Sequence, residues 1–269
     1  MLAAFGGPRM KYYVVDAFTT EPFGGNPAGV CLVDAPLSDV TMQQIASENN
    51  LSETAFVSAN GDAYNLRWFT PAAEIDLCGH ATLATAYVLD TFCQPRRDTY
   101  RFHTMSGELA VTVRDGLLEM DFPSRPPTRT DVTPEMADAI GVEVLEAYVS
   151  RDLILLVESA ESVARLEPDM GKIKAIPDVF AVAVTSKGDG DADFVSRFFA
   201  PRAGIPEDPV TGSSHSSLIP FWASRLGKQE MLARQLSPRG GTLYCRDAGD
   251  RVLIGGQARV YLQGSIEVK

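Results

Sequence analysis

The sequence predicts an α+β protein made of two related halves, and three observations lead to this prediction. Short β-branched and aromatic segments separated by turn residues recur along the chain, as strands do. One stretch, 81–89, carries no charge and is typical of a helix buried on all sides. A five-residue motif at 67–71 recurs at 197–201, each time ahead of an apolar helix, which indicates duplicated domains.

Composition and charge limit the classes of function. The chain has 269 residues, and its 24 Lys plus Arg against 35 Asp plus Glu give a net charge of −11. Such a surface repels phosphate backbones and anionic lipids, so we expect neither a nucleic-acid nor a membrane partner. No apolar run is long enough to span a bilayer, and the first residues lack a secretory core, so we expect a cytoplasmic protein. Its four cysteines lie far apart and are expected to be free thiols.

The first half is predicted to contain most of its strands before the charge-free helix. The glycines at 24–25 join two strands, whereas a dinucleotide fingerprint leads from a strand into a helix, so we exclude that interpretation. Thr41 and Gln44 form a capping-box signal for a short helix that ends near Asn49. The expected strands are 11–18, 28–33, 54–57, 65–69, 108–113 and 117–122.

A proline-rich segment, 123–134, separates the two halves. We expect an N-terminal domain over 10–125 and a C-terminal domain over 126–269, with the last strand packing back on the first domain. In the second half, an apolar helix over 218–226 is followed by Gly227 as its C-terminal cap. The expected strands there are 153–157, 179–184, 194–199, 242–245, 252–254 and 260–262.

The two glycine turns before the apolar helices, at Gly79 and Gly212, suggest where a ligand binds. If a pseudo-twofold axis relates the halves, both helix N-termini face one cleft and offer backbone N–H groups to an anion. The expected ligand is a small anionic organic acid or an amino-acid-like molecule. The alternative is that both glycines only permit tight turns into the helices.

Three residues of the first half are candidates for catalysis. Glu53 lies among apolar neighbours, where desolvation would raise its pKa and suit it to general acid–base catalysis; an exposed or ion-paired Glu is the alternative. His80 is in the first turn of the buried helix, where the helix dipole favours its neutral form, although a core histidine is equally compatible. Cys78 precedes it, where thiolates are stabilised, so a Cys–His nucleophile is a rival chemistry. Neighbours along the chain seldom align for that purpose, and no third orienting residue is evident.

The segment 207–213 of the second half, EDPVTGS, carries the remaining candidates. Asp208 could cap the following helix, orient a substrate amine or move a proton, and Ser213 is either a ligand or a helix-start hydroxyl. His103 and His215 have no partners at metal-ligand spacing, so no metal site is expected.

Together these motifs resemble the PhzF-like phenazine-biosynthesis family, which is similar in fold to diaminopimelate epimerase. The resemblance begins at Met10, so residues 1–9 are expected to be an extension or a misassigned start. One departure is 235–239, QLSPR, where the family usually has Gln-Gly before an Arg. The motifs that carry the resemblance are 16–18 (DAF), 25–28 (GNPA), 52–56 (SETAF), 69–71 (FTP), 79–82 (GHAT) and 208–213 (DPVTGS).

The resemblance implies a fold, an activity and a set of site residues. Each half is expected to wrap a curved sheet around a central helix, with the active site in the cleft between halves. The implied activity is that of a cofactor-free isomerase and homodimer in which Glu53 carries the proton. Two cysteines act as opposed bases in diaminopimelate epimerase, but here Thr211 matches the second, so a single carboxylate is favoured. The expected catalytic residues are Glu53, His80 and Asp208, and the expected substrate-binding residues are Asn26, Cys78, Gly79, Thr211, Gly212 and Ser213.

We therefore predict an isomerase that moves a proton at carbon in a small carboxylate-bearing substrate, with no cofactor. Two rival hypotheses remain: a Cys78-dependent hydrolase or transferase, and a non-catalytic binding protein on the same fold.

Overall fold

The computed structural model describes residues 9–268, so residues 1–8 of the expected extension lie outside the described part. The chain divides into two compact units. Unit 1 contains the residues up to 23, 27–120 and those from 257 onward, and unit 2 contains 24–26 and 121–256. The division falls at Met120 rather than at residue 125. Residues 24–26 group with unit 2 because Arg239 donates to the carbonyls of Gly24 and Gly25.

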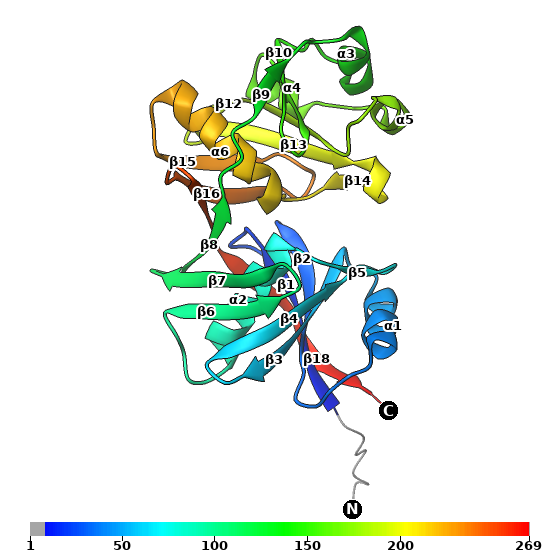
Figure 1. Ribbon diagram of the computed structural model, residues 1–269, viewed down its shortest axis with the longest axis vertical. Helices are drawn as coiled ribbons and strands as arrows, with labels where there is room; N and C mark the ends of the chain where they lie inside the picture. Colours follow the sequence, from blue (N-terminus) through cyan, green and yellow to red (C-terminus); the bar gives the residue numbers. More distant parts are fainter. Residues whose placement is uncertain (1–8, 269) are drawn as a thin grey trace, which may run out of the picture. The chain divides into compact units, whose positions relative to one another are not determined.

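Unit 1 is a mixed sheet in which β1 pairs with both β2 and the last strand of the chain. β2 and β3 are parallel, β3 and β4 antiparallel, and β4 and β6 parallel, with β7 and β8 continuing antiparallel. The short β5 adds to β4. The strands are β1 (Arg9–Ala17), β2 (Asn26–Leu32), β3 (Glu53–Asn60), β4 (Ala63–Phe69), β5 (Glu74–Ile75), β6 (Thr99–Thr104), β7 (Gly107–Arg114), β8 (Leu117–Pro123) and β18 (Ala258–Glu267) (Figure 1).

Unit 2 repeats this order of pairings. β11 and β12 are parallel, β12 and β13 antiparallel, and β13 and β15 parallel, followed by antiparallel β16 and β17. β14 adds to β13 as β5 adds to β4, and β9 and β10 precede the series. The strands are β9 (Thr128–Thr130), β10 (Glu146–Val149), β11 (Leu153–Leu156), β12 (Val182–Lys187), β13 (Phe194–Ala200), β14 (Ile205–Asp208), β15 (Glu230–Gln235), β16 (Gly241–Asp247) and β17 (Arg251–Gly256).

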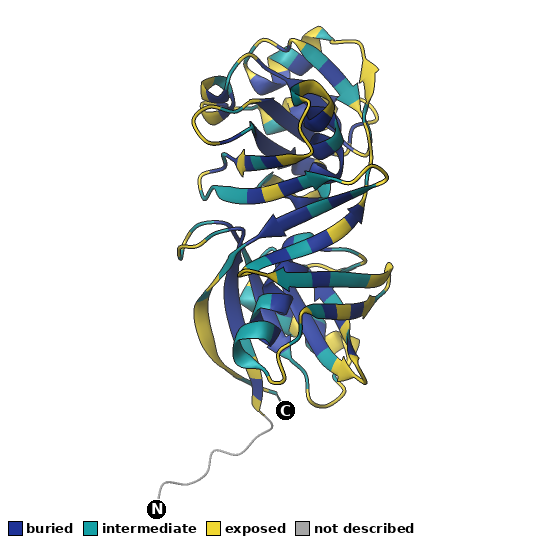
Figure 2. Cartoon of the chain, turned by 90° about the vertical axis from the view of Figure 1, so that its left-hand side faces the viewer, coloured by how far each residue is buried: buried dark blue, intermediate teal, exposed yellow. Residues whose placement is uncertain are grey.

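Each unit holds one long helix against its sheet. α2 (Gly79–Phe92) is buried along most of its length and contacts β1, β3, β7 and β18. Because these strands come from distant positions in the strand order, the sheet curves around the helix. α6 (Gly212–Leu226) holds the corresponding place after β14 and contacts β16 and β17. Figure 2 shows buried residues running through the strands and helices of both units, whereas many loops are exposed. The predicted α+β architecture of two related units is confirmed.

Shorter helices cover the remaining core. α1 (Asp39–Asn49) packs on β3 and β4, and its N-cap is Ser38, whose side chain accepts a hydrogen bond from the Thr41 backbone N–H. In unit 2 an apolar cluster forms beneath α3 (Pro134–Ile140), α4 (Ala160–Ala164) and α5 (Met170–Ala175). Within the described residues, no helix is both long and apolar enough to cross a membrane.

The recurring motif forms the same contacts in both units. Arg67 of β4 donates two hydrogen bonds to the Glu74 carboxylate, at 2.6 and 2.7 Å, and Arg197 of β13 donates two to Glu207, at 2.7 and 2.9 Å. Each guanidinium also lies 5.2 Å from the ring of the phenylalanine two residues further along. The acidic residue after each copy of the motif is therefore the partner of the motif's arginine.

Candidate active site

Glu53 and His80 form a buried pair in unit 1. α1 ends at Asn49, Asn50 adopts a left-handed conformation with φ of 50°, and the chain then enters β3 at Glu53, beside Ala28 of β2. His80 is the second residue of α2. Glu53 Oε2 lies 3.1 Å from His80 Nε2, and each side chain is only 8% exposed. The two elements thus place a carboxylate and an imidazole together away from bulk water.

The facing atoms of both groups have only each other as polar partners. Apart from this ion pair, neither Glu53 Oε2 nor His80 Nε2 has a hydrogen-bond partner within the described residues. Burial acts to lower the pKa of His80, but the neighbouring Cys78 sulfur and Glu53 carboxylate raise it well above 6.5. The direction of this shift favours the protonated imidazole rather than the expected neutral form.

Cys78 completes this group but is not an activated thiolate. It is the N-cap residue of α2, and its sulfur lies 3.5 Å from His80 Nδ1. Burial, followed by the Glu53 charge, raises the pKa of the Cys78 thiol, so the expected stabilisation at the helix start does not prevail. The expectation that Cys78 and His80 would be misaligned is also wrong, because the helix start directs both side chains toward each other and Glu53 provides a third group.

The same three residues form a group of potential metal ligands. One donor atom each from Glu53, Cys78 and His80 lies within 4.8 Å of the other two. Sequence spacing did not indicate this group, since Glu53 belongs to β3 and only the other two are close along the chain. The long-range contact between β3 and the start of α2 brings them together.

Asp208 is the centre of a second polar cluster, in unit 2. Asn26 Nδ2 donates to Asp208 Oδ1 at 2.7 Å and to the Val210 carbonyl at 2.9 Å, and Thr211 Oγ1 donates to Asp208 Oδ2 at 2.5 Å. Both carboxylate oxygens therefore already accept a hydrogen bond. Asn26 Oδ1 is buried and has no hydrogen-bond partner within the described residues. Because Nδ2 faces two acceptors, Oδ1 is the atom left to accept a bond from a ligand.

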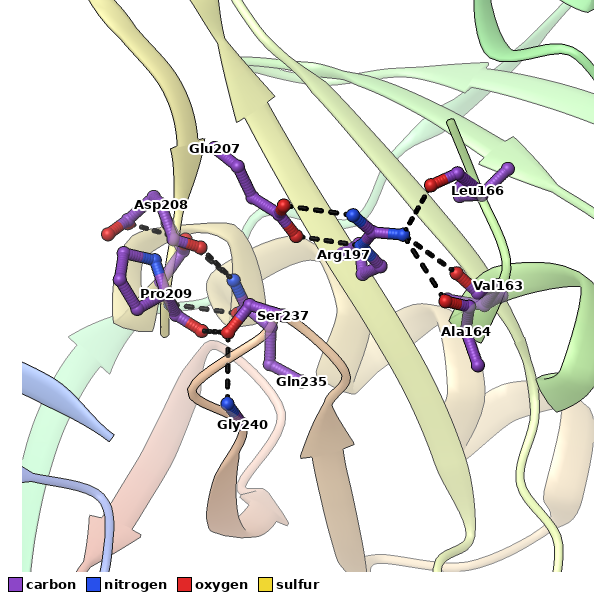
Figure 3. A network of polar contacts seen from close by, with 11 residues as sticks. Val163, Ala164, Leu166, Arg197, Glu207, Asp208, Pro209, Gln235, Ser237 and Gly240 are labelled. Carbon is purple, nitrogen blue, oxygen red and sulfur yellow. Dashed lines mark hydrogen bonds and ion pairs between the residues drawn. The ribbon is translucent and has the colours of Figure 1, made fainter. Parts of the chain in front are cut away.

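Gln235 holds the start of α6 and was not among the predicted site residues. Its Oε1 accepts from the Thr211 backbone N–H at 2.8 Å, and its Nε2 donates to the Asp208 carbonyl at 2.7 Å and to Thr211 Oγ1 at 3.2 Å (Figure 3). The side chain is fully buried. The unusual segment after it is ordered by Ser237, which donates to the Pro209 carbonyl at 2.8 Å. The signal available in the sequence was the atypical segment 235–239, which begins with this glutamine.

The remaining predicted residues lie at the starts of the two long helices. Gly79 is the first residue of α2, Gly212 is the first residue of α6, and Thr211 is the N-cap of α6. Ser213 follows and is half-buried. The structure thus gathers Glu53, Cys78, Gly79 and His80 in unit 1, and Asn26, Asp208, Thr211, Gly212 and Ser213 in unit 2.

Comparison with known proteins identifies the family of the chain. The sequence profile of the family described as "Phenazine biosynthesis-like protein" matches residues 15–264. An uncharacterized isomerase of Pseudomonas aeruginosa is 46% identical over 260 residues, covering 97% of this chain and 100% of that protein. The crystal structure of a phenazine biosynthesis protein of the PhzF family from Enterococcus faecalis matches with a TM-score of 0.96 and 47% identity, covering 97% of this chain and 100% of that chain.

A more distant solved structure shares the fold. It is a hydroxyproline epimerase from Agrobacterium vitis, which matches with a TM-score of 0.61 and 11% identity over 97% of this chain and 93% of that chain. The architecture expected from the sequence motifs is therefore also that of an epimerase fold.

Proposed function

Because the chain belongs to the phenazine biosynthesis-like family and is an isomerase, we propose that it moves a proton at carbon in a small carboxylate-bearing substrate. Glu53 is the general acid–base group, and no cofactor takes part. The observation that carries this proposal is the buried Glu53–His80 ion pair, whose facing atoms lie 3.1 Å apart and have no other polar partner within the described residues.

The proposed reaction conserves atoms and electrons. The Glu53 carboxylate removes a proton from a carbon made acidic by the substrate's carboxylate or by a conjugated double bond. The electron pair of the broken C–H bond is delocalised as an enolate-like anion, and protonated Glu53 returns the proton to a carbon of that anion. His80, whose pKa is raised by the neighbouring sulfur and carboxylate, places a positively charged ring 3.1 Å from this base. Backbone N–H groups at the start of α2 stabilise the developing negative charge.

Unit 2 is proposed to bind and orient substrate rather than to move the proton. Both Asp208 oxygens accept hydrogen bonds from Asn26 and Thr211, which favours a positioning role for this carboxylate. Asn26 Oδ1 offers an acceptor to a substrate hydroxyl or amino group, and Gly212 and Ser213 at the start of α6 offer donors to a carboxylate. That the two helix starts serve one substrate stays a prediction.

Solvent exchange tests the proposal directly. The purified protein would be incubated in deuterated buffer with a panel of small hydroxy, amino and unsaturated carboxylic acids, and each acid examined by NMR. We expect deuterium at a carbon adjacent to, or conjugated with, the carboxylate of at least one acid class. Protein that leaves every C–H signal unchanged across the panel contradicts the proposal.

A second candidate function uses Cys78 as a nucleophile in a hydrolase or transferase. The observation in its favour is the chain of contacts from Cys78 Sγ to His80 Nδ1, at 3.5 Å, and from His80 Nε2 to Glu53. The raised pKa of the Cys78 thiol opposes it. Cys78→Ser separates the two functions: loss of all turnover supports the nucleophile, whereas retained solvent exchange eliminates it.

A further inference from the structure

We propose that the outer edge of β18 is the surface at which two copies of this chain associate, with their β18 strands side by side and antiparallel around a two-fold axis. The homodimer implied by the sequence resemblance had no assigned surface. The proposal concerns residues of unit 1 alone, uses none of the candidate active-site residues, and does not depend on the proposed reaction.

One edge of β18 is open. The strand pairs with β1 from Ala258 to Glu267, and β1 and α2 are the two elements of the described chain that it contacts most. Residues 261–265 are all exposed. Because successive side chains of a strand point to opposite faces, this run of exposure means that neither face is covered there. The backbone N–H and C=O groups on the outer edge are therefore available to another strand.

The open edge lacks the charged residues that commonly prevent strands from associating. The segment 260–266, VYLQGSI, contains no charged residue and no proline. Native proteins protect exposed edges with charges, proline or bulges. The ladder with β1 is irregular between Val14 and Val15, where Tyr261 is the extra residue, and it is regular from Leu262 to Glu267. We expect an uncharged edge of this kind to be covered in the native protein.

Apolar side chains gather beside this edge. Tyr261 and Leu262 are 56% and 41% exposed, and the ring of Phe23, which is 71% exposed, lies edge-on to the Tyr261 ring at 5.5 Å. Phe23 is held in place, because its backbone N–H donates to the Asp16 carboxylate at 2.9 Å. Burial of these side chains against a partner would remove apolar surface from water, which favours association.

A second copy of the chain fits this edge because the charges of the strand are self-complementary. Arg259 and Glu267 flank the uncharged segment, one at each end. With a two-fold axis near Gln263, midway between them, the Arg259 end of each copy lies against the Glu267 end of the other. Glu267 already pairs with Arg9 at 3.4 Å, but both are exposed and such a pair is weak. Chains of net charge −11 repel each other elsewhere, so this arrangement favours association at β18.

Sedimentation of the full-length protein over a range of concentrations provides the test. We expect a particle with twice the mass of one chain. Gln263→Lys places two like charges across the axis and should weaken association at least about tenfold. The matched variant Gln229→Lys makes the same change at an exposed residue of unit 2 and should associate as the unmodified protein does. Circular dichroism of every sample checks that the variants fold.

Exchange of the two flanking charges tests the antiparallel arrangement. Arg259→Glu and Glu267→Arg should each weaken association, because like charges then meet at both ends, and the double variant should regain it. The proposal is overturned if the unmodified protein stays monomeric, if Gln263→Lys associates unchanged, or if the double variant does not regain association. Solvent exchange is measured on the same samples, so a monomer that exchanges deuterium refutes this proposal and leaves the proposed function standing.

Discussion

At the scale of single residues, the important feature is the position of Glu53 beside His80. A carboxylate and an imidazolium that face each other in a buried site stabilise each other's charged forms, and each loses that support when its partner is removed. Burial acts to lower the pKa of His80, whereas the Cys78 sulfur and the Glu53 carboxylate both act to raise it. Removing the Glu53 charge should therefore weaken the support for the protonated imidazole.

This account predicts the titration of His80. In the unmodified protein, ring-nitrogen NMR should show His80 still protonated at pH 7, because its pKa is raised well above 6.5. In Glu53→Gln the attraction of the carboxylate is removed while burial remains, so the pKa of His80 should fall. Glu48→Gln, which alters an exposed residue of α1, should leave it unchanged.

His215 gives the internal reference for this measurement. Burial lowers its pKa to about 4, and its Nδ1–H donates to the Thr211 carbonyl at 2.8 Å, so it should stay neutral between pH 5 and 8. An unchanged His80 titration in Glu53→Gln would show that the two side chains do not interact in solution.

At the scale of elements, the buried Arg197–Glu207 pair fixes β14 against β13, directly before Asp208. Arg197 also donates to the Leu166 carbonyl at 2.8 Å and approaches those of Val163 and Ala164 at 3.4 Å (Figure 3). Its counterpart Arg67 pairs with Glu74 and Asp39 but is 34% exposed, against 9% for Arg197. The arginine of the motif is therefore less exposed to solvent in unit 2 than in unit 1.

The repeat offers a matched pair of variants for this difference. Glu207→Gln leaves a buried guanidinium without its carboxylate and should lower the free energy of unfolding by about 3–5 kcal/mol. Glu74→Gln removes the equivalent carboxylate where water and Asp39 remain available to Arg67, so its cost should be clearly smaller. Denaturant unfolding of both variants measures the two decreases in the free energy of unfolding. Equal decreases would contradict the difference in burial between the two ion pairs.

Several elements could be predicted from sequence because their signals are local. The charge-free run predicted α2, and Gly227 is the predicted C-terminal cap of α6. The N-cap of α1 is Ser38 rather than Thr41, because the Ser38 hydroxyl accepts the hydrogen bond from the Thr41 backbone N–H. Strands β5, β6, β9, β10, β14 and β15 were missed, because their charged residues or short lengths weaken the alternation that marks a strand.

At the scale of the whole molecule, the chain contains a duplicated topology, and its last strand, β18, pairs with the first strand, β1. The order of strand pairings in unit 1 recurs in unit 2, as the Arg67 and Arg197 motifs predicted. The contacts that bring Glu53 to His80, and Gln235 to Thr211, are long-range and carry no local signal. The sequence motifs therefore named candidate residues but not which of them touch, and the roles of these residues and the homodimer stay predictions.

Because the last strand, β18, belongs to unit 1, removing it should destabilise that unit. β18 pairs with β1 from Arg9 opposite Glu267 to Ala17 opposite Ala258. Ending the chain at Gly256 removes this partner and leaves the backbone groups of β1 that face β18 unpaired, so the truncated protein should aggregate or unfold at lower denaturant concentration. Ending it at Ile266 removes only the last residues of the ladder and should have little effect. Similar unfolding midpoints for both truncations would contradict the structural role of β18.

The measurement that tests the account most directly is the rate of deuterium transfer to substrate carbon by Glu53→Gln, using an acid identified in the solvent-exchange panel. The account predicts a loss of at least about 10²-fold relative to the unmodified protein, because an amide cannot accept the carbon-bound proton, while Glu48→Gln keeps its rate. Full exchange by Glu53→Gln would contradict it and would place the proton-transfer group elsewhere in the molecule.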